Sequence, residues 1–121
     1  FDRFPSLKIV IRHMGENIPF SLERIDNRYL WEIEMAGLQK PMKRLPSEYF
    51  RDNIIVTTSG MNFRLPLMMT IEALGADNLL FAADWPFEIA RPAVDTVDAL
   101  PIPEADKDKL YHLNAKRVFK L

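Results

Sequence analysis

Three short runs of apolar, largely β-branched residues constrain the fold of this chain more than any other feature. The runs occupy residues 7–13, 53–59 and 78–84, and a glycine or a proline follows each run within two residues of its end. Nearly continuous apolar character, without strict alternation, is typical of strands that are covered on both faces. The runs therefore predict buried strands of a parallel sheet.

Helical periodicity fills most of the chain between and after these runs. Apolar residues recur at helical spacing over residues 18–38, 65–74, 89–100 and 104–119. Residues 40–52 contain two prolines and are expected to form a surface connection, with one short turn for which Ser47 is a plausible N-cap. The order strand, helix, strand, helix, strand, helix, helix indicates βα units in one α/β domain.

The composition argues against several classes of partner. Sixteen basic and seventeen acidic residues nearly cancel, so we expect no surface for nucleic acid. No apolar run approaches the roughly 20 residues that a membrane helix needs, and we expect no membrane partner. The chain has no cysteine, which excludes a disulfide framework and is compatible with a cytoplasmic protein. It begins at Phe1 rather than Met, and we expect a piece of a longer protein.

Polar residues gather where the three predicted strands end. The first strand ends at His13, with Glu16 shortly after it, the second ends at Ser59, and the third ends at Asp84. In parallel α/β folds the ligand binds at the carboxyl ends of the strands. Two strands with one strand between them lie about 9.6 Å apart, so side chains from both can reach one ion or substrate. His13 and Asp84 are therefore the candidate active-site groups.

Each of these residues also has a structural interpretation. A single histidine at a strand end is more often a hydrogen-bonded structural residue, and Asp84 would then cap the next turn. Glu16 would be a charge stabilised by a helix N-terminus, and Thr58 and Ser59 ordinary turn residues. The functional interpretation is favoured because His13 and Asp84 both end buried strands and are both followed at once by turn residues.

The motifs at the strand ends resemble those of a known family. Residues 1–16, which end in His-Met-Gly-Glu, are similar to the sixth-strand region of the metal-dependent decarboxylases of the amidohydrolase superfamily. Within that family the chain looks most like the γ-resorcylate and 2,3-dihydroxybenzoate decarboxylases. Residues 57–60 (Thr-Thr-Ser-Gly) resemble their seventh strand, and residues 84–88 (Asp-Trp-Pro-Phe-Glu) resemble their eighth. The resemblance covers essentially the whole chain.

The resemblance implies the carboxyl-terminal part, strands 6 to 8 with their helices, of a (β/α)8 TIM barrel. Residues 1–121 would then be a fragment of a single barrel domain, inactive by itself. The implied activity is metal-dependent, non-oxidative decarboxylation of hydroxybenzoate-type aromatic acids. The implied cofactor is a divalent ion, zinc or manganese, and the implied assembly of the full-length protein is a homo-oligomer, a dimer or tetramer.

The same resemblance assigns roles to individual residues. Asp84 resembles the metal-binding carboxylate of the eighth strand, His13 the histidine beside the metal, and Glu16 the carboxylate that orients it. These three are the implied catalytic residues. The implied substrate-binding residues are Ser59, Phe87, which would shape the aromatic pocket with Pro86, and Arg24, whose counterpart reaches a neighbouring subunit's site.

Two departures from the family pattern leave alternatives open. The family normally has glycine before the strand-end histidine, where this chain has Arg12. By strand alternation Arg12 faces the helices, so it either extends outward between them or marks a perturbed strand. The first-strand and fifth-strand metal ligands are absent from the chain. The alternatives are a hydrolase of the same superfamily and a non-catalytic remnant that functions by association with another chain.

Overall fold

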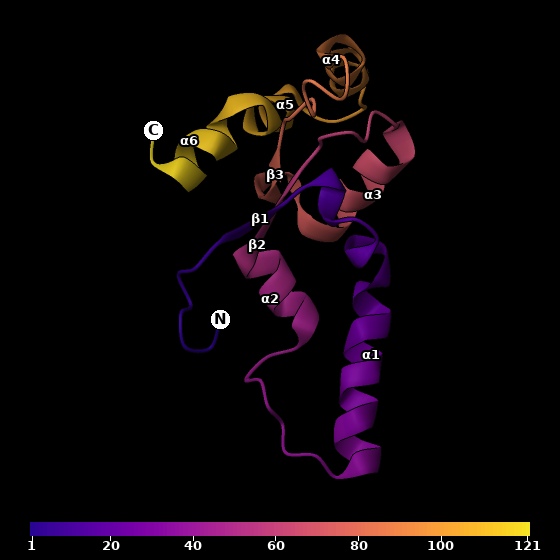
Figure 1. The fold of residues 1–121 in the computed structure, drawn as a ribbon, viewed down its shortest axis with the longest axis vertical. Coiled ribbons are helices and arrows are strands. Elements are labelled where there is room, and N and C mark those ends of the chain that lie inside the picture. The colour runs from indigo at the N-terminus through magenta and orange to yellow at the C-terminus, as the bar shows by residue number, and fades with distance from the viewer.

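The centre of the computed structural model, which describes residues 1–121, is a parallel sheet of three strands (Figure 1). The strands β1 (Ile9–Ile11), β2 (Ile54–Thr57) and β3 (Leu79–Leu80) lie side by side in chain order. Ile11 is opposite Val56, and Val56 is opposite Leu79. The predicted α/β fold with parallel strands is confirmed. The strands are shorter than predicted, and a residue with positive φ (His13, Gly60 or Asp84) follows each strand within four residues.

Helices follow each strand as the periodicity predicts. β1 leads through the turn η1 (His13–Gly15) into α1 (Ile18–Ala36), and β2 leads to α3 (Arg64–Leu74). A short turn, η2 (Ala76–Asn78), enters β3, after which come α4 (Ala90–Asp98), α5 (Glu104–Asp108), the π-helical turn η3 (Lys109–Leu113) and α6 (Asn114–Phe119). None of these helices has the length and apolar character needed to cross a membrane.

A further helix, α2 (Pro46–Asn53), occupies most of the segment that was predicted to be a surface connection. Its N-cap is Leu45, so the prediction of Ser47 as N-cap is wrong. The backbone N–H of Ser47 donates to Oδ1 of Asp26 in α1 at 2.9 Å. The N–H of Leu45 donates to Oε2 of Glu48 at 2.7 Å. A carboxylate from another helix therefore satisfies an N-terminal donor of α2, and local sequence does not reveal such a contact.

The main core lies between one face of the sheet and the helices. Ile54, Val56 and Leu79 pack there with apolar residues of α1, α2, α3, α4 and η3: Leu22, Phe50, Leu74, Val97 and Leu110. All four residues of β2 are buried, as predicted for a strand covered on both faces. Ile9 and Val10 of β1 are exposed instead, because β1 has a neighbouring strand on one side only.

The C-terminal helical segment supports β3, which is only two residues long. The backbone N–H of Phe81 donates to the carbonyl of Leu110, inside the π-helical turn, at 2.8 Å. The side-chain amide of Asn114, which is 2% exposed, donates to the carbonyls of Ala76 at 2.7 Å and Leu79 at 2.8 Å. These bonds fix the position of the third strand and of the residues that follow it.

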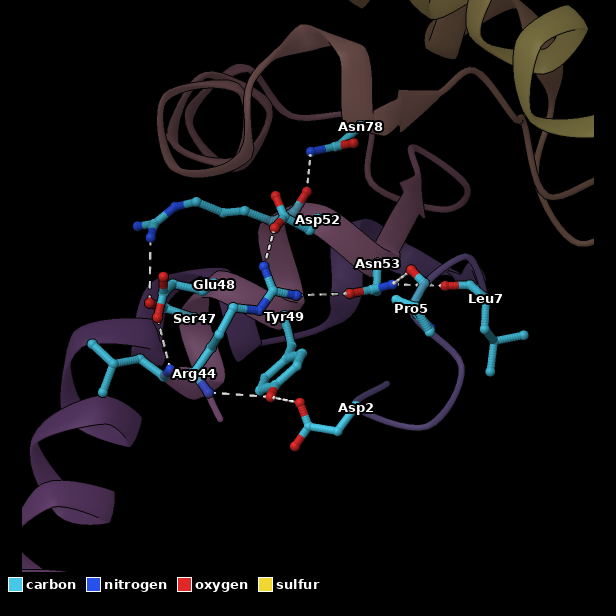
Figure 2. A network of polar contacts seen from close by, with 12 residues as sticks. Asp2, Pro5, Leu7, Arg44, Ser47, Glu48, Tyr49, Asp52, Asn53 and Asn78 are labelled. Carbon is cyan, nitrogen blue, oxygen red and sulfur yellow. Dashed lines mark hydrogen bonds and ion pairs between the residues drawn. The ribbon is translucent and has the colours of Figure 1, made fainter. Parts of the chain in front are cut away.

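A polar network joins the segment before β1 to α2 (Figure 2). The side-chain amide of buried Asn53 donates to the carbonyls of Pro5 and Leu7, both at 2.9 Å. The Tyr49 hydroxyl donates to the carboxylate of Asp2, and this bond is the main reason that the pKa of Asp2 lies below its usual value. The network holds the entry to β1 against the end of α2.

We expect the substitution Asn114→Ala to destabilise the chain. It leaves two carbonyls beside β3 without their donor, which should lower the free energy of unfolding by about 1 to 3 kcal/mol. Urea unfolding followed by circular dichroism measures the change. His112→Ala, an exposed position two residues earlier, is the control and should change the free energy by less than about 0.5 kcal/mol. Equal stability of the two variants would contradict the role given to Asn114.

Candidate active site

The three strands end at one edge of the sheet, and residues from all three ends meet there. Gly60, which follows β2, has φ +65° and no side chain. A Cβ atom at Gly60 would lie 3.1 Å from Nδ1 of His13 and 3.4 Å from Oδ2 of Asp84. The structure therefore brings the side chains of His13 and Asp84 together around the space that a side chain at Gly60 would fill.

His13 lies in the turn after β1 and not in the strand, with φ 51°. Strand alternation therefore does not determine the direction of its side chain. Its ring Nδ1 lies 2.8 Å from the carbonyl oxygen of Ser59. Because a carbonyl only accepts, Nδ1 must carry the proton of the neutral ring. Nε2 is then free to accept a proton or to bind a metal ion.

Ser59 is 3% exposed and is hydrogen-bonded to both the ring and the backbone of His13. Besides its carbonyl, its hydroxyl lies 3.4 Å from the backbone N–H of His13, which donates to it. The same hydroxyl is hydrogen-bonded to the Thr57 hydroxyl at 2.8 Å. In this chain Ser59 thus positions His13, and its contact with substrate stays a prediction.

Thr58 extends the pairing of β2 and β3 beyond the strands. Its hydroxyl donates to the carbonyl of Ala82 and accepts from the N–H of Ala82, both at 3.0 Å. Its own N–H donates to the carbonyl of Leu80 at 3.0 Å. Thr58 therefore has a structural role, but it continues the strand pairing and is not the turn residue that was expected. Its effect is to fix the backbone two residues before Asp84.

The backbone of Asp84 stabilises a turn, and its carboxylate is available for contacts with other groups. Its backbone has φ 68°, and its carbonyl accepts from the N–H groups of Phe87 at 2.9 Å and Glu88 at 3.1 Å. The turn is thus held by the backbone of Asp84, and the carboxylate is left for other contacts. That side chain is 18% exposed, and its Oδ1 lies 3.8 Å from Nη1 of Arg12.

Arg12 does not face the helices, and the prediction that it does is wrong. Ile11 packs against the core under the helices, so alternation places Arg12 on the opposite face of the sheet, where Asp84 lies. The Arg12 side chain is 69% exposed and needs no buried partner. The first strand is therefore not perturbed by a buried charge. The prediction treated residues 7–13 as one strand, whereas β1 ends at Ile11 and His13 lies in a turn.

The side chains of Glu16, Arg24 and Phe87 make no hydrogen bond or ion pair with the side chains of His13 and Asp84. The Glu16 side chain is exposed, and the His13 ring is hydrogen-bonded to Ser59 instead. Arg24 lines an open depression of about 450 Å³ on α1, together with Arg28 and Trp31. Phe87 is 83% exposed. The roles predicted for these three residues therefore require contacts with protein segments outside this chain.

The donor atoms at this edge suit a divalent metal ion but do not complete a site for one. A histidine Nε2 and a carboxylate oxygen are ligands that zinc and manganese accept. The chain contains no group of three or more histidine, aspartate or glutamate side chains placed to hold an ion. Protein metal sites usually use at least three ligands. His13 and Asp84 therefore fit as part of a larger ligand set.

Sequence reasoning missed the two features that hold this site together. It took Gly60 only as the end of a strand, and it did not predict that Thr58 would pair with Ala82. A glycine directly after a strand, between two polar strand ends, is a signal for close approach of side chains. The link between Thr58 and Ala82 had no such signal, since it depends on the register of two strands.

Comparisons with known proteins agree with this fold. A family model described as amidohydrolase matches residues 1–121. The chain is 44% identical over 122 residues to the γ-resorcylate decarboxylase of Polaromonas sp. strain JS666, covering all of this chain and 36% of that protein. The chain thus spans about a third of the length of the relatives that it matches.

Solved structures show the same relation. The crystal structure of 5-carboxyvanillate decarboxylase from Sphingomonas paucimobilis matches with a TM-score of 0.92 and 45% identity, over 100% of this chain and 36% of that one. A dihydroxybenzoic acid decarboxylase from Polaromonas sp. JS666, solved with bound manganese and the inhibitor 2-nitroresorcinol, matches with a TM-score of 0.86 and 41% identity. The match covers 100% of this chain and 36% of that one.

We expect the substitution Gly60→Ala to displace the His13 ring. Gly37→Ala is a matched control, because Gly37 also has a positive φ (61°) but no atom lies within 4 Å of its added Cβ. Both changes strain the backbone by about 1 to 2 kcal/mol. Only Gly60→Ala should also alter the ¹⁵N signals of the His13 ring and its Nδ1–H tautomer, with His112 as internal reference. Unchanged His13 signals in Gly60→Ala would contradict the close approach.

Proposed function

The chain belongs to the amidohydrolase family, and we propose that it forms the last three βα units of a complete (β/α)8 barrel. The proposed activity of that barrel is metal-dependent, non-oxidative decarboxylation of hydroxybenzoate-type aromatic acids. The observation that carries the proposal is the convergence of His13 and Asp84 on Gly60 at the carboxyl edge of the sheet. The likeness to γ-resorcylate decarboxylase over the whole chain supports it.

The reaction determines what the residues must do. Loss of carbon dioxide leaves the electron pair of the broken carbon–carbon bond on the ring carbon, which must take up a proton. A divalent ion, when bound by the substrate carboxylate and the adjacent phenolic oxygen, fixes the ring and withdraws charge. We assign Asp84, entering the reaction as the carboxylic acid, to deliver its proton to the ring carbon, and the carboxylate that is left would be a ligand of the metal ion.

The hydrogen bond of Nδ1 leaves the other ring nitrogen of His13 available as a partner for the phenol. With its Nδ1–H given to the Ser59 carbonyl, Nε2 can accept a proton from the phenolic oxygen or from a water. Ser59 and Gly60 hold the ring in that orientation. The fixed tautomer allows His13 to act without first rotating its ring.

The roles of the other predicted site residues depend on parts of the complete barrel that this chain does not contain. In the complete barrel we assign Glu16 to the orientation of His13, in addition to Ser59, which is hydrogen-bonded to the ring in this chain. Arg24, Phe87 and Ser59 are assigned to substrate binding. Arg24 and Phe87 have exposed side chains in this chain, so they are available to another subunit or to loops that close over the substrate. The homo-oligomer and the cytoplasmic location stay predictions.

Two alternatives remain, and each has its own test. A hydrolase of the same superfamily would use the same barrel and metal ligands, but would cleave esters or amides and release no carbon dioxide. The 121-residue chain by itself should bind metal poorly and catalyse nothing, because it carries only two of the donor groups. A non-catalytic remnant would keep this behaviour even when it is bound to its partner chain.

We expect Asp84→Asn in the full-length protein to reduce the rate of carbon dioxide release from 2,6-dihydroxybenzoate by at least about 100-fold, since the proton donor is lost. Asp95→Asn is the control, because Asp95 lies in α4 and pairs only with exposed Arg91. A metal-loaded Asp84→Asn enzyme with full decarboxylase activity would show that Asp84 has been given the wrong role.

We also expect removal of the metal to abolish the activity. Dialysis of the full-length protein against a chelator should lower carbon dioxide release to background, and added Mn²⁺ or Zn²⁺ should restore it. Comparison of the two ions decides which one the enzyme uses. Activity that persists in protein shown by elemental analysis to be free of metal would refute a metal-dependent mechanism.

A further inference from the structure

The turn that carries His13 has a strained backbone over four consecutive residues. His13, Met14, Gly15 and Glu16 have φ values of 51°, 54°, 73° and 55°. Glycine adopts such values without strain, but the other three residues do so at a cost in free energy. The N–H of Gly15 donates to the carbonyl of Arg12, and the N–H of Glu16 donates to the carbonyl of His13, both at 2.9 Å. These are ordinary turn bonds, so other contacts must enforce the strained conformation.

Met14 attaches this turn to the interior of the protein. Its side chain is 1% exposed and belongs to an apolar cluster with Leu67 of α3 and Leu100, which follows α4. The hydroxyl of Thr70, a fully buried residue of α3, donates to Sδ of Met14 at 3.7 Å. Leu67, Thr70 and Leu100 thus form a pocket, the Met14 pocket, whose walls are mainly apolar and which offers one hydrogen to the weak sulfur acceptor.

The next residue attaches the turn to a different group of buried side chains. A Cβ atom added at Gly15 would lie 3.2 Å from the Phe50 ring and 3.2 Å from Cγ1 of Val56. The backbone of Gly15 therefore lies directly on the main core, whereas Met14 lies in the second cluster. A rotation of the backbone at Met14 would separate the turn from one of these two clusters.

The strain lies beside the group that the proposed reaction uses. Met14 directly follows His13, so a change in its backbone dihedral angles would alter the approach of Nδ1 of His13 to the Ser59 carbonyl. A turn that served stability alone would gain from glycine at positions with positive φ, because glycine removes the strain. Met14 has a large side chain there instead, and strained residues persist where the surroundings enforce them.

We propose that Met14 is a positioning residue for His13: its burial in the Met14 pocket enforces the strained turn, and the turn directs Nε2 of His13 into the active site. The inference rests on the proposed function, because it gives Met14 a part in that reaction without any contact to the substrate or the metal ion. Loss of the Met14 side chain should therefore lower kcat through a change at His13, in a protein that still folds and holds its metal.

The substitution Met14→Ala empties the pocket and leaves His13 in place. In the manganese-loaded, full-length protein we expect kcat for carbon dioxide release from 2,6-dihydroxybenzoate to fall at least about tenfold, with unchanged metal content. Met14→Leu refills the pocket with an apolar side chain of similar volume and should recover most of this loss.

Leu74→Ala is the matched control. Leu74 is 6% exposed and lies at the C-terminal end of α3, in the main core and outside the Met14 pocket. Its truncation also leaves a cavity in the interior, so it should lower the stability against urea in a similar way. Because it does not alter the turn, its kcat should stay within about twofold of the wild-type value.

Nuclear magnetic resonance of the zinc-loaded protein, which is diamagnetic, adds a readout that does not depend on activity. The ¹⁵N signals of the His13 ring should shift in Met14→Ala and stay unchanged in Leu74→Ala. In the wild type, the ¹³C-labelled methyl group of Met14 should be rigid, with an order parameter well above that of Met35, which is 66% exposed.

Equal kcat in Met14→Ala and Leu74→Ala, or unchanged His13 signals in Met14→Ala, overturns the inference. If Met14→Ala does not fold, the methyl measurement on the wild type decides, and a Met14 methyl group as mobile as that of Met35 overturns it. Failure of the proposed function would appear separately, as a wild-type protein that releases no carbon dioxide from hydroxybenzoates, while the His13 signals would still test the positioning by Met14.

Discussion

The parallel pairing of β2 with a strand on each side is the constraint on which the rest of this structure depends. Parallel strands end at the same edge of a sheet, so the residues after β1, β2 and β3 must meet there. The row Ile11, Val56 and Leu79 fixes the register, because these side chains lie opposite one another and face the helices. A shift of one residue would turn the apolar row away from the core. The register therefore also places His13 opposite the residues that hold it.

The site itself is built mainly by the backbone. His13, Gly60 and Asp84 all have positive φ, which is unfavourable for residues other than glycine and persists only where the surroundings enforce it. Ser59 supplies that support for His13, and Thr58 supplies it for the segment before Asp84. The same hydrogen bonds that end the strands therefore also orient the polar side chains. This is why small residues with hydroxyl groups, which look like ordinary turn residues, matter as much here as the charged ones.

The incompleteness of the site follows from the incompleteness of the sheet. Three strands have free edges and cannot close a barrel, so β1 leaves Ile9 and Val10 exposed where a further strand would pair. For the same reason the chain by itself holds no group of three or more side chains that could bind a metal ion. At the other edge of the sheet no further strand pairs with β3. There η3 and α6 stabilise β3 and the residue after it through hydrogen bonds of Leu110 and Asn114.

The sequence by itself determined the alternation of strands and helices and the two residues His13 and Asp84, because hydrophobic periodicity and strand-end position are local properties. It also indicated the family, through motifs at the three strand ends. Only the tertiary structure decided how these residues face each other. The helix α2 depends on Asp26 of another helix, the His13 tautomer depends on the Ser59 carbonyl, and the direction of Arg12 depends on where β1 ends. Strand alternation failed at His13 because positive φ ends the extended conformation there, and a pattern of residue types does not record φ.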